Sequence, residues 1–221
     1  MLTLVFDTCF NKSYIVLSCD NKVVCSDIIE STDKNYHSAF LIPKIRDILK
    51  NQNIQIKDLD AIGVNIGPGS FTGIRAGITI ARVLCQQANI KLVGVSSLEI
   101  LSKLNKTDMK SIITLDARKN KVYYAEYYNN KTIIEPKLIE KEELLDNIDS
   151  HYFVISDASI HRYLEEHQIE ALNFEENANE LGTYLSQLVN LKLSDNKDYN
   201  WAKVKPLYIQ QPSITKNSYN K

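Results

Sequence analysis

The sequence predicts an α/β protein in which one structural unit occurs twice. Short apolar runs, typical of buried strands, alternate with longer segments whose apolar residues recur at helical spacing. The order of strands, turns and helices in the first half then begins again near residue 107, which indicates an internal repeat.

The first half, residues 1–106, is predicted to open with three strands and to continue with alternating helices and strands. The predicted strands cover residues 2–6, 13–19, 23–29, 61–66 and 92–95. Helices are predicted over 37–50, over 74–88 and from Ser96 or Ser97 to Leu104. Asp20-Asn21-Lys22 supplies a hairpin turn, and Glu99 lies at the capping-box position relative to Ser96.

The second half repeats this opening at a shift of 109 residues. Six of 16 aligned positions are identical, because Asp7, Asn11, Lys12, Tyr14, Asn21 and Lys22 fall on Asp116, Asn120, Lys121, Tyr123, Asn130 and Lys131. About one identity is expected at average residue usage. The abundance of Asn and Lys in this chain raises that figure, so coincidence is the alternative to a true duplication.

The remaining elements complete a second lobe over residues 107–208. Strands are predicted at 112–115, 122–128 and 152–156, and helices at 142–146 and 178–191. The last helix has an apolar stripe that is expected to pack in the core, formed by Leu181, Leu185, Leu188 and Leu191 or Lys192. Residues 209–221 are predicted to be a loose polar tail.

Composition and charge exclude several classes of protein. The 26 Lys and Arg residues are balanced by 27 Asp and Glu residues, whereas a protein that grips a polyanion alone usually carries a basic surplus. The four cysteines lack zinc spacing and the four histidines include no pair spaced by four, so no metal site is expected. Neither a signal peptide nor a membrane span of roughly 20 residues is visible, which predicts a cytoplasmic protein without membrane contact.

Glycine is concentrated in one turn. Five of the seven glycines lie within fifteen residues, at Gly63, Gly67, Gly69, Gly73 and Gly77. A turn that needs positive φ or a close backbone approach explains Gly67 and Gly69, with Pro68 fixing the bend between them. Ser70 or Thr72 is then expected to cap the helix that follows.

Gly73, Gly77 and Ala81 form a ridge of small residues along that helix. A glycine in a helix interior costs roughly 1 kcal/mol relative to alanine, so the ridge needs a reason. Either it packs on the protein's own sheet or it contacts another subunit, and the second is our hypothesis. A bulky residue at Gly77 is then expected to abolish association while the monomer stays folded. The predicted partner interface comprises Gly67, Pro68, Gly69, Ser70, Phe71, Thr72, Gly73, Arg75, Gly77 and Ala81.

The turn fits no phosphate-binding or nucleophile motif. A glycine loop between a strand and a helix would suit an anion. However, the Walker pattern needs a lysine after Gly73, and the dinucleotide fingerprint needs a different glycine spacing. A hydrolase elbow needs glycine where Pro68 stands, and no nucleophile–base pair supports a peptidase.

The run GPGSFTGIRAG, from Gly67 to Gly77, resembles the signature of the bacterial TsaB (also YeaZ) family. Supporting matches are Asp7-Thr8, His37-Ser38 with Leu41 and Pro43, the run from Gly94 to Leu98, and Asp116-Ala117-Arg118 followed by Val122-Tyr123. The resemblance extends from residue 2 to about 128. Pro206-Leu207-Tyr208 is a weaker match to the family's terminal Pro-x-Tyr, and Gln210 stands where the family has arginine.

This resemblance implies a duplicated actin-like fold (ASKHA, Hsp70-like and RNase H-like). It also implies a place in the machinery that attaches a threonylcarbamoyl group to N6 of adenosine 37 in tRNAs reading codons that begin with A. In that machinery TsaD is the transferase, TsaE is an ATPase and TsaB is the dimerisation partner. We therefore expect a non-catalytic scaffold subunit that meets TsaD and TsaE, reaches tRNA only through the complex and forms a homodimer when alone.

Nucleotide binding is expected to be weak. Actin-like ATPases place a glycine-containing hairpin after the first strand of each lobe, whereas the segments that begin at Asp7 and Asp116 contain no glycine. Asp7, Thr8 and Asp116 are the candidates for weak nucleotide or Mg²⁺ binding, and the alternative is that the acids only end buried strands. We expect no tightly bound cofactor, with ATP or ADP at a subunit junction as a hypothesis. A stand-alone kinase or ATPase of this fold is the competing function.

Overall fold

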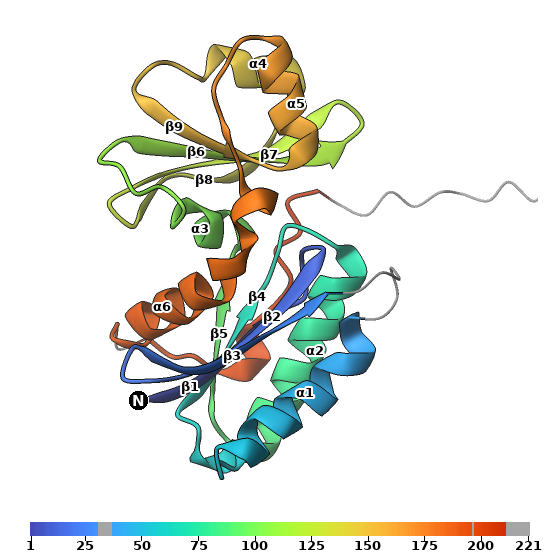
Figure 1. Cartoon of the computed structure of the whole chain (residues 1–221), viewed down its shortest axis with the longest axis vertical. Coiled ribbons are helices and arrows are strands. Elements are labelled where there is room, and N and C mark those ends of the chain that lie inside the picture. The colour runs from blue at the N-terminus through green and yellow to red at the C-terminus, as the bar shows by residue number, and fades with distance from the viewer. Residues whose placement is uncertain (31–36, 196, 211–221) are drawn as a thin grey trace, which may run out of the picture.

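The chain folds into two α/β lobes, each built on a five-stranded sheet (Figure 1). The computed structural model describes residues 1–30, 37–195 and 197–210. Helices cover both sheets, and a short helix lies between the lobes. The helices are α1 (His37–Asn51), α2 (Phe71–Ala88), α3 (Ser97–Ser102), α4 (Lys141–Asp146), α5 (Ala158–Glu166) and α6 (Leu181–Leu193), with 3₁₀ turns η1 (Ile56–Asp58), η2 (Phe174–Glu180) and η3 (Trp201–Lys203).

In the first sheet the strands lie in the order β3-β2-β1-β4-β5. They are β1 (Leu2–Asp7), β2 (Lys12–Cys19), β3 (Lys22–Glu30), β4 (Ala61–Asn65) and β5 (Lys91–Val95). β1 pairs antiparallel with β2 and parallel with β4, and β4 pairs parallel with β5. The carboxyl ends of β1, β4 and β5 therefore meet at one edge of the sheet, which is where open α/β sheets place their functional residues.

The second sheet has the same topology. Its order is β10-β9-β6-β7-β8, formed by β6 (Lys110–Arg118), β7 (Lys121–Tyr128), β8 (Lys131–Glu140), β9 (Tyr152–Ser156) and β10 (Leu172–Asn173). β6 pairs antiparallel with β7 and parallel with β9, as β1 does with β2 and β4. Because β2 and β7 begin and end 109 residues apart, the predicted duplication is confirmed.

Alternate residues of β1 pack on opposite faces of the first sheet. Leu4 and Phe6 belong to the core under α1 and α2, whereas Val5 belongs to a second core that includes Leu185 of α6. This second core continues into Ile113 and other residues of the second sheet. A third core lies between the second sheet and helices α4 and α5. The first sheet is thus sandwiched between α1 and α2 on one face and α6 on the other (Figure 1).

The end of the chain departs from the predicted division of the lobes. Residues 107–208 are predicted as one lobe, but α6 and the segment after it pack on the first sheet. A Cβ atom at Gly63 of β4 would lie 2.3 Å from Val189 Cγ2, and the Leu92 N–H donates to the Tyr199 carbonyl oxygen at 3.0 Å. The physical reason is that the apolar face of β1 and β2 opposite α1 and α2 needs a cover, which the leucine stripe of α6 supplies.

Smaller differences concern element boundaries and the tail. α2 begins at Phe71, before the predicted start, and β8, α5 and β10 are not among the predicted elements. Residues 211–221 of the predicted polar tail lie outside the described residues. Among the helices that the structure describes, none is long and apolar enough to cross a membrane.

Candidate functional site

The glycine-rich turn connects β4 to α2 at the edge where the parallel strands of the first sheet end. Gly67 has a φ of +97°, a backbone conformation that requires glycine in practice. Gly69 lies against the loop that joins β1 to β2, which is called the first hairpin below. A Cβ atom at Gly69 would be 2.6 Å from the Cys9 carbonyl oxygen in this loop. Ser70 caps α2, because its Oγ accepts a hydrogen bond from the Gly73 N–H at 3.2 Å. Of the two predicted capping residues, the structure selects Ser70.

The ridge of small residues faces the chain's own first hairpin. A Cβ atom at Gly73 would lie 1.8 Å from the Thr8 carbonyl oxygen, and one at Gly77 would lie 2.6 Å from Thr8 Oγ1. Ala81 is fully buried. The small residues of the ridge therefore allow a close approach between α2 and Thr8 of the same chain. This is the first of the two interpretations of the ridge, in which it packs within the protein itself. A bulky residue at Gly77 would collide with Thr8, so the expectation that such a variant stays folded as a monomer is wrong.

The ten residues predicted as a partner interface divide into an inward and an outward group. The inward group is buried or half-buried and consists of Gly67, Pro68, Gly73, Gly77 and Ala81. The outward group is exposed and consists of Gly69, Ser70, Phe71, Thr72 and Arg75. The inward residues set the position of α2, and the interface role of the outward residues stays a prediction.

An exposed stack of side chains lies at the start of α2. The Arg75 guanidinium lies 3.9 Å from the centre of the Phe71 ring, and its Nε donates to the Tyr208 hydroxyl at 2.9 Å. The Phe71 and Tyr208 rings are 5.5 Å apart and about two fifths exposed. Tyr208 comes from the Pro-x-Tyr segment, which is tied beside the turn because the Leu207 N–H donates to the Ile66 carbonyl oxygen at 2.8 Å.

The outer faces of α1 and α2 carry further exposed apolar groups. An open hollow beside the stack is lined by Phe71, Thr72, Arg75, Ala76, Thr79 and Ile80. A more apolar hollow near the end of α1 is lined by residues that include Ile42, Ile45, Leu49, Ile54 and Leu84. Ile42 and Val83 are 55% and 52% exposed. Exposed apolar side chains that gather on one face in this way are a common feature of protein–protein contacts.

Asn65, the last residue of β4, holds the turn through its side chain. Its Oδ1 accepts hydrogen bonds from the Gly67 N–H at 2.8 Å and from Ser97 Oγ at 2.9 Å. Its Nδ2 donates to Asp7 Oδ2 at 2.8 Å. The Ser97 N–H also donates to the Gly67 carbonyl oxygen at 2.9 Å. The turn is therefore joined to the end of β1 and to the start of α3.

Asp7 is almost fully buried, and both of its carboxylate oxygens are engaged. Oδ1 accepts the Cys9 N–H at 2.7 Å, and Oδ2 accepts the Asn65 side chain. Burial raises the pKa of Asp7 to about 6, although the hydrogen bonds from Asn65 and Cys9 act in the opposite direction. A Mg²⁺ ion at Asp7 would have to share the carboxylate with these hydrogen bonds, at a side chain that is only 1% exposed.

Asp116 repeats the turn of Asp7 in the second lobe. Its Oδ1 accepts the Arg118 N–H at 2.9 Å, the same two-residue contact that joins Asp7 to Cys9. Asp116 is exposed, and its N–H donates to Asp157 Oδ2 at 2.6 Å. Burial raises the pKa of Asp157. The structure therefore brings Asp7 and Thr8 to the glycine-rich turn and places Asp116 in the other lobe.

The histidines lie apart from this site. His151 accompanies Asp149, His161 accompanies Glu165, and His167 lies beside the Tyr163 carbonyl oxygen. His37 begins α1, and its side chain lies outside the described part. Within residues 1–30, 37–195 and 197–210, no group of three or more His, Cys, Asp or Glu residues could hold a metal ion.

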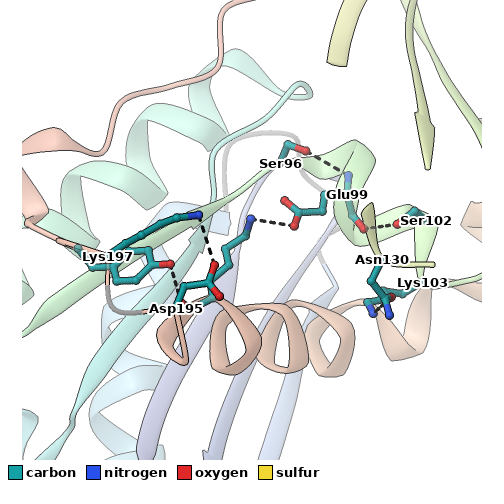
Figure 2. A network of polar contacts seen from close by, with 9 residues as sticks. Ser96, Glu99, Ser102, Lys103, Asn130, Asp195 and Lys197 are labelled. Carbon is teal, nitrogen blue, oxygen red and sulfur yellow. Dashed lines mark hydrogen bonds and ion pairs between the residues drawn. The ribbon is translucent and has the colours of Figure 1, made fainter. Parts of the chain in front are cut away.

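A polar network around α3 joins the two lobes (Figure 2). Ser96 Oγ accepts the Glu99 N–H at 3.1 Å, as the capping signal predicted, and the Glu99 carboxylate pairs with Lys192 of α6 at 2.8 Å. At the other end of α3, Lys103 contacts the Asn130 side chain in the turn between β7 and β8. α3 is thus tied both to α6 and to the second sheet.

Asn65 and Ser97 were not identified from the sequence as residues that hold the glycine-rich turn in place. Asn65 was part of an apparently apolar strand, and Ser97 was considered only as a helix cap. The signal that could have found Asn65 is an amide at the end of an otherwise apolar strand, next to a glycine turn. Such a buried amide needs several hydrogen-bond partners, and the turn is the nearest source of them.

Comparison with known proteins places the chain in a family. The family described as "TsaD: tRNA N6-adenosine threonylcarbamoyltransferase" matches residues 24–188, well over half of the chain. The "tRNA threonylcarbamoyladenosine biosynthesis protein TsaB" of Buchnera aphidicola (strain APS) is 27% identical over 66% of this chain and 76% of its own length. The proteins of that name from Escherichia coli K12 and Bacillus subtilis 168 are 32% and 31% identical, over 49% and 66% of this chain.

The chain belongs to this family and to its TsaB (YeaZ) group. The alignments span 50% of the length of the E. coli TsaB protein and 63% of the B. subtilis one. The solved structure "YeaZ from Pseudomonas aeruginosa" has a TM-score of 0.76 at 20% identity and covers 94% of this chain and 100% of that chain. This chain therefore shares its two-lobed α/β fold with that YeaZ structure.

Proposed function

We propose that this chain is a non-catalytic scaffold subunit of the cytoplasmic complex that forms N6-threonylcarbamoyladenosine at position 37 of tRNAs reading codons that begin with A. It would support the transferase TsaD together with TsaE and would meet tRNA only within the complex. The names of the curated TsaB relatives support the pathway. The geometry of the turn and of α2 supports the role within it.

The observation that carries this proposal is the use of the turn's N–H groups within the chain. The Gly67 N–H binds Asn65, the Ser70 N–H binds the Cys9 carbonyl oxygen, and the Gly73 N–H binds Ser70 Oγ. A phosphate cradle needs such N–H groups free to point at an anion. A turn whose donors are engaged in this way is suited to holding a helix in place rather than a nucleotide.

Because the turn holds α2 in place, we propose that the outward face of α2 is the surface that contacts a partner protein. Phe71, Arg75 and Tyr208 form an aromatic and guanidinium cluster, and these residue types dominate binding energy in protein interfaces. The apolar groups of α1 and α2 extend the surface beyond this cluster. We propose TsaD as the main occupant and a second copy of this chain as the occupant when TsaD is absent, because an exposed helix pair can form a two-fold contact.

The proposal includes no tightly bound cofactor. The Asp7 carboxylate accepts hydrogen bonds from Asn65 and Cys9. Thr8 Oγ1 donates to the Gly73 carbonyl oxygen at 2.7 Å, so the side chains of both residues are engaged within the chain. Any ATP or ADP would then lie at a subunit junction of the assembled complex, where Asp116 of the exposed second hairpin is the remaining candidate ligand. Titration of the isolated chain with ATP tests this, and micromolar affinity would favour a phosphotransferase instead.

Association with TsaD is the direct test. Arg75→Ala should weaken the affinity for purified TsaD about tenfold or more, because it removes the central group of the exposed cluster. Arg162→Ala, at an exposed position on α5 in the other lobe, is the matched control and should bind as the unmodified chain does. Equal affinity of all three proteins for TsaD would show that α2 is not the interface.

A tRNA modification assay tests the role in the complex. Purified TsaD, TsaE and this chain, supplied with tRNA, ATP and an activated threonylcarbamoyl donor, should form threonylcarbamoyladenosine together, and omission of this chain should abolish the product. Full product formation without this chain would refute the scaffold role. Light scattering of the chain alone should return the mass of a dimer, and a monomer at high concentration would contradict the proposed self-association.

A further inference from the structure

The glycine-rich turn is held in place by a short chain of hydrogen bonds that starts at Asp7. We propose that Asn65 is the positioning residue that sets the turn and the start of α2 for binding TsaD, and that Asp7 fixes the orientation of the Asn65 amide. This inference rests on the proposed function, because TsaD is the partner whose binding it concerns. It adds two buried residues, neither of which touches the partner.

The Asn65 amide can take only one orientation. The Gly67 N–H can donate but cannot accept, so the Asn65 oxygen must face it. The same oxygen also accepts from Ser97 Oγ, which leaves the amide nitrogen pointing at Asp7. No other uncharged side chain of this length offers an acceptor for two donors and a donor for a carboxylate.

Asp7 is equally specified by its surroundings. Two donors face it, the Cys9 N–H and the Asn65 amide, and each takes a different carboxylate oxygen. An asparagine at position 7 would have one oxygen for these two donors and would turn its own NH₂ group against one of them. Asp7 and Asn65 are both 1% exposed, so a lost partner could not be replaced by bulk water.

The same hairpin also grips the start of α2. The Ser70 N–H donates to the Cys9 carbonyl oxygen at 2.8 Å, and Thr8 Oγ1 donates to the Gly73 carbonyl oxygen at 2.7 Å. Together with Asn65, these contacts fix both ends of the turn. Phe71 lies between Ser70 and Gly73, so a displaced turn would move the first residue of the exposed cluster.

Exchange of the two side chains gives a sharp test. Asp7→Asn places two donors opposite each other, and Asn65→Asp places two carboxylates opposite each other. The double variant Asp7→Asn/Asn65→Asp restores a donor–acceptor pair, and its new carboxylate can still accept from Gly67 and Ser97. Asn105→Asp is the control, because Asn105 lies in the loop after α3 and donates to Met109 and Ser111 of that loop and the strand that follows it.

Three readouts are compared for each variant. The affinity for purified TsaD should fall at least tenfold in both single variants and should return to within about threefold in the double variant. Hydrogen exchange at the Gly67 N–H should speed up in the single variants and slow again in the double variant. The control Asn105→Asp should change neither the affinity for TsaD nor the hydrogen exchange of the Gly67 N–H. Lowering the pH from about 8 to 6 should improve TsaD binding by Asn65→Asp more than by the unmodified chain, because a shared proton relieves the carboxylate pair.

The outcomes separate the two proposals. Failure of the unmodified chain to bind TsaD would refute the proposed function, and the positioning role would fall with it. Normal TsaD binding by a folded single variant, or a double variant as weak as the single ones, would overturn the positioning role alone. If the single variants do not fold, Ser97→Ala removes only one donor to Asn65 and should still speed Gly67 exchange and weaken TsaD binding about threefold. An unchanged Ser97→Ala would then overturn the inference.

Discussion

Thr8 and Gly73 touch through their backbones so closely that no side chain fits between them. A Cβ atom at position 73 would lie 1.8 Å from the Thr8 carbonyl oxygen, and Thr8 Oγ1 donates to the Gly73 carbonyl oxygen at 2.7 Å. The first hairpin and the start of α2 are thus one packed unit. The glycine is required by the chain's own fold, whatever binds to the outer face of α2.

Gly73→Ala is therefore expected to destabilise the chain. Alanine favours a helix interior over glycine by roughly 1 kcal/mol, but the collision with Thr8 should outweigh this and lower the free energy of unfolding by about 1–3 kcal/mol. Urea unfolding measures the difference. Thr79→Ala, at an exposed position of the same helix, should stay within about 0.5 kcal/mol of the unmodified chain. A stabilised Gly73→Ala variant would show that the hairpin and the helix can separate at no cost.

The duplicated fold could be predicted because its signals are local. In each lobe a buried run ends in an acid and leads into a hairpin with Asn at the turn, at Asn21 and at Asn130. Spacing alone then reveals the repeat. The need for glycine at position 67 is also local, since it follows from the positive φ of the turn, whereas glycine at position 69 is required by the close approach of Cys9.

The contacts of the ridge could not be predicted, because they depend on tertiary packing. A sequence shows that something comes close to Gly73, but Thr8 lies 65 residues away. The leucine stripe of α6 likewise predicts burial without naming the sheet that buries it. Asn65 escaped notice for a related reason: its partners come from β1, the turn and α3, and only the folded sheet brings these together.

Leu185→Ala tests the placement of α6 on the first sheet. Leu185 is fully buried in the core that contains Val5, so its truncation should cost about 2–5 kcal/mol of unfolding free energy. Leu191→Ala makes the same chemical change on the same helix at a position that is 52% exposed, and it should cost less than about 1 kcal/mol. Chemical unfolding measures the unfolding free energy of both variants, and hydrogen exchange in β1 reports whether the first sheet is affected. Equal costs would contradict the packing of α6 described above.

Asp7 should give the stability of the chain a recognisable pH dependence. Its pKa is raised from 3.8 to about 6 in the folded chain, so the folded state binds the proton more tightly than the unfolded state. Stability should therefore rise as the pH falls from about 7 to about 4, by about 2–2.5 kcal/mol from this group. The difference in unfolding free energy between the unmodified chain and Asp7→Asn isolates this contribution. A difference that does not vary with pH would show that folding leaves the pKa of Asp7 unchanged.

The ion pair between Glu99 and Lys192 is expected to stabilise the joint between the lobes. Their side chains are only 22% and 31% exposed, and Figure 2 shows Glu99 on α3 pointing toward α6. A double-mutant cycle with Glu99→Gln and Lys192→Met should give a coupling energy of about 0.5–1 kcal/mol, because partial burial reduces screening by water and salt. Asp195 and Lys197 form a more exposed pair nearby, so the same cycle with Asp195→Asn and Lys197→Met should give a value near zero. Equal coupling in the two cycles would mean that the Glu99 pair adds nothing beyond a surface contact, and α3 would then be held to α6 by apolar packing alone.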